Sequence, residues 1–368
     1  MTKIEYNVII ANQSNPYNAI SANFYKLAQG LSGQRKTFLH LISCSKEYED
    51  FVRVITSSYN IQLNFYKNLN DFLLEMKNKT PQSSIFIFSA WVTPLYRYWL
   101  EFAIKLKKIG LKILVMEYYP LFFDRFSSEK MIDKIVTRYP IYKLLSHRKA
   151  KLYNLADFLI INDTNSAKVV KDYFNIEPDC IIHEAIDTTF FLFSKYTKRD
   201  SVVLHYPSEM GESNFKKIIK ILNVINPKTV YILGKCPSEI QFSNLPIQKI
   251  FESNYTNERL KNIYSKAMFS IVIENKGTFE LIPIESIASG VPVIGYKSPS
   301  IYILETVLKD NNIDNLPFIE LTEASGFDNR NSFNFLQENI TEISDIVRQE
   351  FSREKFALKV LECVEEKT

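Results

Sequence analysis

The sequence predicts an α/β protein made of two doubly wound, Rossmann-like domains that face each other across a cleft. Short apolar stretches alternate with amphipathic stretches along the chain, and this series stops near residue 188 and restarts near residue 201. Apolar strands alternating with amphipathic helices indicate a parallel sheet covered on both faces. A chain of 368 residues is long enough for two such domains. We place them at residues 1–190 and 191–368, with terminal helices that could pack back on the first domain.

Short apolar runs mark the strands expected in the first domain. They are 6–11, 37–43, 61–66, 84–88, 111–117, 158–162 and 180–183. Apolar residues at helical spacing predict the intervening helices. These are 19–31, 69–77, 94–108, 127–153 with an interruption at Pro140, and 166–174.

The second series has the same alternation. Strands are expected at 201–206, 229–233, 269–274 and 291–296, and helices at 214–224, 257–266 and about 333–366. In open parallel sheets, ligands bind beyond the carboxyl ends of the strands. The cleft between two such sheets is therefore the expected site.

The charge of the chain is modest and uneven. The formal net charge is +4, which gives no support for a nucleic-acid partner. A basic stretch nevertheless runs from Asp124 to Lys151, where eight Lys and Arg residues accompany three carboxylates. This pattern suits an anionic substrate or a peripheral contact with lipid headgroups, and a solvated helix face is the competing and simpler interpretation.

The spacing of the cysteines and the length of the apolar runs indicate the cellular compartment of the protein. Cys44, Cys180, Cys236 and Cys363 follow no CxxC spacing, which predicts reduced, structural thiols in a cytosolic protein. The start, MTKIEYNVII, enters a strand without a signal-peptide pattern, and no apolar run reaches about 18 residues. We expect a cytoplasmic protein that could also lie peripherally at the inner membrane face.

The stretch GTFELIPIESIASGVPVIGY, residues 277–296, concentrates polar and helix-boundary signals at the end of a predicted strand. Pro283 suits the first turn of a helix, and Gly290 can end it in a left-handed conformation. Backbone N–H groups around Phe279–Ile282, with the helix dipole behind them, can bind phosphate. Glu285 could accept hydrogen bonds from a ribose diol, and Glu280 could face a sugar hydroxyl or a developing positive centre. A capped connector helix is the competing interpretation.

The same residues resemble the donor-site segment of retaining glycosyltransferases with the GT-B fold, family 4. The closest part is ESIASGVPVI, and the likeness extends to NERLKNIYSKAMFSIVI, LADFLIINDTNSAKVVKDYF and VVLHYPSEMGESNFKKIIKIL. It covers residues 150–300 well and residues 1–150 by strand order. The resemblance implies a hexosyltransferase that takes a nucleotide-sugar donor without a metal or other cofactor. The acceptor would be a glycan, a lipid or a protein-linked group.

The resemblance also implies roles for individual residues. Glu285 matches the second glutamate of the family's paired-glutamate motif, which binds the donor ribose. The backbone from Thr278 through Phe279, Leu281 and Ile282 matches the part that binds sugar and phosphate. Ser208 and either Lys216 or Lys217 would hold the diphosphate. On the acceptor side, Ser14, Asn15, Glu117 and His183 are the candidate cleft-lining residues.

Several family positions are replaced in this chain. The first glutamate of the motif falls at Gly277, flanked by Glu274 and Glu280. The Arg and Lys that clamp the diphosphate fall at Glu209 and Asn214. A Gly-Gly loop after the first strand is replaced by NQSNPYNAIS. These replacements favour an alternative hypothesis, a catalytically degenerate GT-B protein that binds a nucleotide, a glycan or a partner protein.

Other reaction classes gain no support from motifs. The chain has no Asp-x-Asp pair, no Walker A sequence, no GxGxxG and no GxSxG. Its four histidines show no metal-ligand spacing. We therefore expect no metal site.

Overall fold

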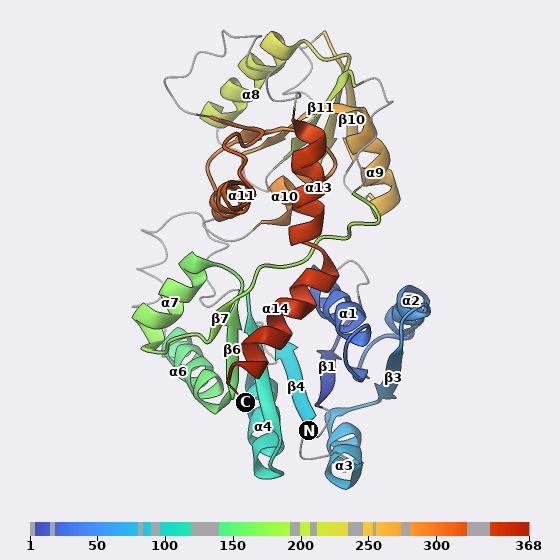
Figure 1. Ribbon diagram of the computed structural model, residues 1–368, viewed down its shortest axis with the longest axis vertical. Helices are drawn as coiled ribbons and strands as arrows, with labels where there is room; N and C mark the ends of the chain where they lie inside the picture. The colour runs from blue at the N-terminus through green and yellow to red at the C-terminus, as the bar shows by residue number, and fades with distance from the viewer. Residues whose placement is uncertain are drawn as a thin grey trace. The chain divides into compact units, whose positions relative to one another are not determined.

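The computed structural model describes residues 4–14, 19–79, 84–89, 96–118, 140–191, 199–206, 212–234, 246–252, 255–273, 280–321 and 339–367. Contacts divide the chain into two compact units. The first unit combines Met1–Ala185 with Ser352–Thr368, and the second is Ile186–Phe351. The C-terminal helix therefore belongs to the unit that begins the chain (Figure 1).

The first unit is built on a seven-stranded parallel sheet with the order β3-β2-β1-β4-β5-β6-β7. Its strands are β1 (Glu5–Ala11), β2 (Thr37–Ile42), β3 (Ile61–Tyr66), β4 (Ser84–Ser89), β5 (Lys112–Glu117), β6 (Phe158–Ile161) and β7 (Cys180–Ile181). The chain moves outward from β1 to β3 and then crosses to β4. The strand order thus reverses between β1 and β4, which is where doubly wound sheets bind ligands.

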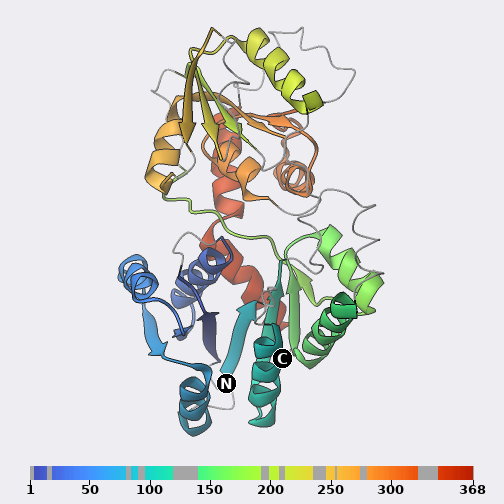
Figure 2. The ribbon, with the colours of Figure 1, turned by 180° about the vertical axis from the view of Figure 1, so that it is seen from behind.

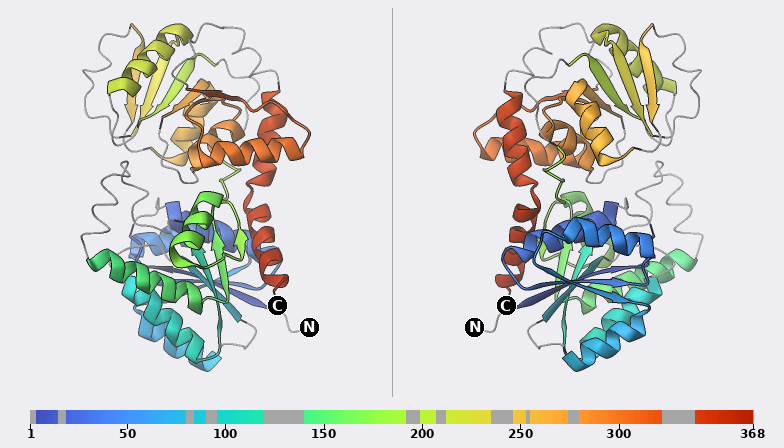
Figure 3. Two further views of the ribbon diagram at one scale, coloured as in Figure 1. Left: turned by 90° about the vertical axis from the view of Figure 1, so that its left-hand side faces the viewer. Right: turned by 90° about the vertical axis from the view of Figure 1, so that its right-hand side faces the viewer.

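Helices cover both faces of this sheet because its strands are apolar on both sides. One face carries α1 (Ala19–Ser32), α2 (Lys46–Thr56) and α14 (Arg353–Glu365). The other carries α3 (Leu69–Lys79), α4 (Tyr96–Lys108), α6 (Pro140–Leu155) and α7 (Thr164–Phe174). Figure 1 shows α14 in front of the strands, and Figure 2, from behind, shows α4 in front of them. The edge-on views of Figure 3 show α1 and α4 on opposite sides of the sheet.

The second unit repeats the plan with a six-stranded parallel sheet of order β10-β9-β8-β11-β12-β13. Its strands are β8 (Ser201–His205), β9 (Thr229–Leu233), β10 (Gln248–Glu252), β11 (Ala267–Val272), β12 (Val293–Gly295) and β13 (Phe318–Glu320). Helix α8 (Glu212–Ile225) packs on one face. The other face carries α9 (Asn257–Lys266), α10 (Leu281–Ala288), α11 (Pro299–Asp310) and α13 (Ile340–Glu350). Here the strand order reverses between β8 and β11.

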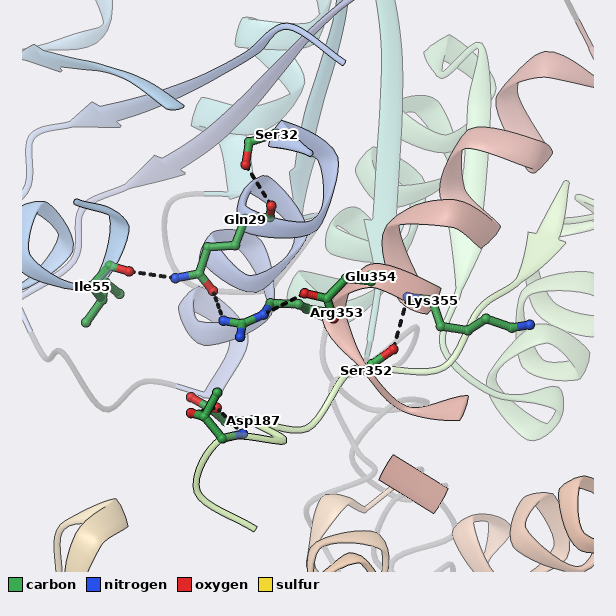
Figure 4. A network of polar contacts seen from close by, with 9 residues as sticks. Gln29, Ser32, Ile55, Asp187, Ser352, Arg353, Glu354 and Lys355 are labelled. Carbon is green, nitrogen blue, oxygen red and sulfur yellow. Dashed lines mark hydrogen bonds and ion pairs between the residues drawn. The ribbon is translucent and has the colours of Figure 1, made fainter. Parts of the chain in front are cut away.

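Helix α14 is fixed to the first unit by close packing and by polar contacts with α1. A Cβ added at Gly30 would lie 2.7 Å from the Cβ of Ala357, so the two helices cross at a distance that glycine permits. Gln29 donates to the carbonyl oxygen of Ile55 at 2.8 Å and accepts from the Arg353 guanidinium at 3.2 Å (Figure 4). Side chains of α14 complete the core on this face of the sheet.

A disulfide between Cys180 and Cys363 joins β7 to α14. The expectation that these two cysteines are reduced thiols is therefore wrong. Their sequence separation of 183 residues gives no local signal, and the return of α14 to the first unit brings them together. Cys44 is free and half-buried, whereas Cys236 lies outside the described residues.

Every strand expected from the sequence is present, with ends that differ by a few residues. The structure adds the short edge strands β10 and β13 and the helices α2 and α11. Of the long helix expected at 127–153, the described part starts at Pro140, the expected interruption. The two-unit parallel α/β fold class is confirmed.

Candidate functional site

In the second unit, three of the predicted site residues lie on one face of α10. Leu281, Ile282 and Glu285 are partly exposed, and the other five residues of the helix are buried. Residues of a helix are about 100° apart, so positions 281, 282 and 285 fall within an arc of about 100°. Because α10 follows β11, its first turn lies at the edge where the strand order reverses, and Leu281 and Ile282 also pack against the core of this unit.

The start of α10 is held by a serine from the next helix. Glu280 is the N-cap residue, and its N–H donates to Ser300 Oγ at 2.6 Å. The same hydroxyl donates to the Glu280 carbonyl oxygen at 2.7 Å. Gly290 ends the helix region with φ 69°, in the left-handed conformation expected for it. Thr278, Phe279 and Ser208, like Gly277 and Glu209, lie outside the described residues.

Two tyrosines lie within electrostatic reach of Glu285. Burial, followed by the negative charge of Glu285, raises the pKa of Tyr255 above its ordinary value. The same two causes, in the same order, raise the pKa of Tyr264 well above its ordinary value. Both phenols therefore stay protonated near the carboxylate. The sequence pattern did not single out either residue.

Tyr264 also belongs to a buried polar chain. Its hydroxyl lies 3.0 Å from His205 Nε2 and 3.2 Å from Ser286 Oγ. Ser286 Oγ donates to the carbonyl oxygen of Ile282 at 2.8 Å. Burial lowers the pKa of His205 to about 3, so the imidazole is neutral at physiological pH. The chain links the end of β8 to α9 and α10.

The two candidate lysines on α8 differ in their surroundings. Lys217 Nζ lies 3.2 Å from the Tyr296 hydroxyl, which itself donates to Asn214 Oδ1 at 2.9 Å. Lys216 is exposed. Lys217 and Asn214 are three residues apart and so share a face of α8. Tyr296, the residue after β12, contacts both of them on this face. This cation therefore lies beside the position where the family carries its lysine.

In the first unit, Glu117 lies at the carboxyl end of β5 and is turned inward. Its carboxylate is 2.9 Å from Lys149 Nζ and accepts from the Tyr153 hydroxyl at 2.5 Å. Both charged side chains are almost fully buried. Lys149 is therefore not part of an exposed basic surface, contrary to the expectation for 124–151. Lys151 is exposed, and the side chains from 124 to 146 lie outside the described residues.

The remaining acceptor-side candidates lie at the ends of β1 and β7. Ser14 is exposed, and Asn15 lies outside the described residues. His183 is half-buried, with Nδ1 2.7 Å from the carbonyl oxygen of Asn162. Burial lowers its pKa. At the turn after β1, Asn12 adopts φ 55° in place of the family's glycine.

Next to His183 is a buried carboxylate that was not selected as a site residue. Glu184 Oε2 accepts from Asn23 Nδ2 at 2.6 Å, and Oε1 lies 3.5 Å from Asn162 Nδ2. Lys26 Nζ donates to the adjacent carbonyl oxygen of Ala185 at 2.8 Å. Burial raises the pKa of Glu184 to about 7, against the hydrogen bonds and the charge of Lys26, which lower it. The carboxyl is thus close to half-protonated at neutral pH.

Metal-binding clusters and membrane-spanning helices are both absent from the described residues. No group of three or more His, Cys, Asp or Glu side chains in these ranges could hold a metal ion. No helix within the described part of the chain has the length and apolar character needed to cross a membrane.

Solved structures of other proteins have the same fold as this chain. No protein-family model and no curated protein sequence matches the chain. HepE of Anabaena, solved with UDP-glucose, has a TM-score of 0.64 at 11% identity and covers 99% of this chain and 100% of its own. Sucrose-phosphate synthase of Thermosynechococcus elongatus has a TM-score of 0.60 at 11% identity, covering 99% of both chains.

A third similar structure is a mutant O-GlcNAc transferase of Thermobaculum terrenum. Its TM-score is 0.58 at 10% identity, over 99% of this chain and 67% of that one. Identities near 10% show likeness of fold, and the fold shared with these proteins is GT-B.

Proposed function

We propose that the chain is a glycosyltransferase that moves a hexose from a nucleotide-sugar donor to an acceptor. The acceptor is a glycan, a lipid or a protein-linked group, and transfer retains the anomeric configuration without a metal. The observation that carries the proposal is the partly exposed face of α10, formed by Leu281, Ile282 and Glu285. This helix follows β11, one of the two strands between which the strand order of the second unit reverses.

Each residue of this face has a chemical role in the proposal. The Glu285 carboxylate accepts hydrogen bonds from the two ribose hydroxyls. Backbone N–H groups at the start of α10 bind the phosphates, aided by the helix dipole. Lys217 neutralises part of the diphosphate charge, and Glu280 contacts the sugar. The residues at the ends of β1 and β7 in the first unit, including Ser14, contribute to binding the acceptor.

For this reaction the protein needs mainly to bind the two substrates and to stabilise the negative charge of the leaving diphosphate. In retaining transfer, the leaving phosphate can take the proton of the attacking hydroxyl, so no separate protein base is needed. The rate enhancement then comes from positioning the reactants and stabilising the diphosphate as it leaves. Support for a UDP-linked donor comes from HepE, which was solved with UDP and UDP-glucose.

Nucleotide binding tests the proposal directly. Calorimetry or thermal shift with UDP, GDP and ADP and their sugar conjugates, each with magnesium and with EDTA, should identify one nucleotide that binds independently of magnesium. Binding at 100 times the dissociation constant stabilises a protein by about 2.7 kcal/mol, which is readily measured. Absence of binding by every nucleotide would refute the donor site.

Two matched pairs of variants locate the site. Glu285→Gln should weaken binding of that nucleotide about tenfold or more, whereas Glu342→Gln, an exposed glutamate on α13, should not. Lys217→Met should weaken it by about 10- to 100-fold and leave binding of the free nucleoside unchanged, because a phosphate contact is lost. Lys216→Met, its exposed neighbour, should have little effect. Equal effects of the two lysine variants would contradict the assignment.

A second candidate function is binding without catalysis. It is favoured by Asn214, which accepts a hydrogen bond from Tyr296 where the family carries a lysine. A wild-type protein that binds a nucleotide sugar but neither transfers nor hydrolyses it, with any of the acceptor classes, would support this alternative.

A further inference from the structure

Helix α10 is short, and polar contacts hold both of its ends. At the C-terminal end, the Arg199 guanidinium donates to the carbonyl oxygens of Ser289, at 3.2 Å, and Gly290. Ser344 Oγ from α13 donates to the carbonyl oxygen of Ala288 at 2.5 Å. Together with Ser300 at the N-cap, these contacts fix the position of the helix along its axis. They lie at the ends, so they restrain rotation of the middle turn less directly.

The middle turn is held from the side by the chain of His205, Tyr264 and Ser286. Ser286 is fully buried and precedes Ile287 in the core, while Glu285 on its other side is partly exposed. All three members of the chain belong to the second unit. The chain therefore fixes the residue adjacent to Glu285 to two other elements, β8 and α9.

One assignment of the hydroxyl and imidazole protons satisfies the hydrogen bonds of this chain. The Ile282 carbonyl can only accept, so the single Ser286 proton points to it. The Tyr264 proton can then be donated to Ser286 Oγ, and His205 can donate from Nε2 to the Tyr264 oxygen. This assignment requires a neutral His205 imidazole that carries its proton on Nε2. Removal of the Tyr264 hydroxyl leaves His205 and Ser286 without this buried partner, and also removes the polar interaction between Tyr264 and the buried Ser270.

A small rotation of α10 would displace the Glu285 carboxylate appreciably. Side-chain ends lie about 5–6 Å from a helix axis. A rotation of about 20° therefore moves such a group by about 2 Å, which exceeds the tolerance of a hydrogen bond. Loss of the side contact at Ser286 removes one restraint on this rotation.

We infer that Tyr264, with His205 and Ser286, is a positioning residue that sets the orientation of Glu285 for the ribose of the donor nucleotide. This role rests on the proposed function, because it assumes that Glu285 binds ribose. Tyr264 touches α10 and not the reacting atoms. Its effect is therefore on discrimination of the ribose hydroxyls rather than on phosphate binding.

The experiment compares the affinities of UDP and 2′-deoxy-UDP for the full-length protein. The variants are Tyr264→Phe, Ser286→Ala, Glu285→Gln and the double variant Tyr264→Phe/Glu285→Gln. Tyr231→Phe, a buried tyrosine on β9 of the same unit, is the matched control. Circular dichroism and the melting temperature show that each variant is folded, and Ser286→Ala provides a second test if Tyr264→Phe is not.

Wild type and Tyr231→Phe should bind UDP at least about tenfold more tightly than 2′-deoxy-UDP, because the carboxylate loses a hydrogen bond to the deoxy form. In Tyr264→Phe and Ser286→Ala this preference should fall to about threefold or less, because UDP loses contacts from both ribose hydroxyls and 2′-deoxy-UDP loses only the one from its 3′-hydroxyl. The double variant should match Glu285→Gln alone.

Two results would overturn the inference in distinguishable ways. If Glu285→Gln abolishes the ribose preference and folded Tyr264→Phe and Ser286→Ala keep it, the positioning role is wrong and the donor site stands. If wild type binds none of UDP, GDP and ADP, or Glu285→Gln keeps the full preference, the donor-site assignment fails and the positioning role fails with it. If wild type binds GDP or ADP in place of UDP, the same comparison is made with that nucleotide and its 2′-deoxy form.

Discussion

Replacing Glu184 with glutamine should change how the stability of the first unit depends on pH. Glutamine has nearly the same shape, can still accept from Asn23, and adds an amide donor near Asn162. The Asn162 Oδ1 atom is buried without a hydrogen-bond partner, so it can accept from this donor once the Asn162 amide turns by 180° and exchanges Nδ2 for Oδ1. The substitution therefore removes a titrating group while retaining the local hydrogen bonds.

The sign and size of the effect follow from linkage. The pKa of Glu184 rises from 4.5 to about 7 on folding, so between these values the folded state holds a proton that the unfolded state has released. The free energy of unfolding therefore falls as pH rises through this window, and the full loss is present above about pH 7. A shift of this size corresponds to about 3 kcal/mol at most. The nearby charges of Lys26 and Asp163 act in opposite directions and are included in the shift.

Urea unfolding at pH 5, 6, 7 and 8 measures this effect. Both tryptophans, Trp91 and Trp99, lie in the first unit, so their fluorescence follows that unit. From pH 5 to pH 8, Glu184→Gln should gain about 1–3 kcal/mol in free energy of unfolding relative to wild type. Glu362→Gln, an exposed site on α14, is the control and should show no such gain. A constant difference between Glu184→Gln and wild type at all four pH values would refute the argument.

Two further predictions concern the attachment of α14. Cys363→Ser should lower the free energy of unfolding of the first unit by about 2–5 kcal/mol, because the disulfide closes a loop of 183 residues. Cys44→Ser, the control, should leave it unchanged. An unchanged melting temperature of the wild type in reductant would contradict this role of the disulfide. Gly30→Ala should destabilise by about 1–3 kcal/mol in urea unfolding, because its Cβ would overlap Ala357. Gly33→Ala is the matched control, since its Cβ would meet only the Gly30 carbonyl oxygen at 3.7 Å. Equal effects of the two alanine variants would argue against the close helix crossing.

The sequence predicted those parts of the fold that depend on local pattern. The apolar strands of both sheets and the two ends of α10, which lie within two residues of Pro283 and Gly290, are encoded by neighbouring residues. Edge strand β10, with the sequence QKIFE, is half-exposed and charged, so it lacks the apolar run used to recognise the inner strands. Helix α2 was missed because its mean composition is polar, although Tyr48 and Val52 pack into the core.

The site was predictable only where its residues are close in sequence. Leu281, Ile282 and Glu285 follow from helical spacing within one segment. The contact of Tyr264 with His205 spans 59 residues, and no local pattern indicates it. Lys149 was counted as part of a basic surface because sequence does not distinguish a solvated lysine from one that pairs with a buried carboxylate.

The return of α14 to the first unit has a consequence for biosynthesis. Phe356, Val360 and Leu361 complete the core beneath one face of the first sheet, yet they are translated after the whole second unit. During synthesis, the second unit can therefore finish folding while the first, although made earlier, still exposes an apolar face. Such a face invites association with other chains or with chaperones until the last helix leaves the ribosome.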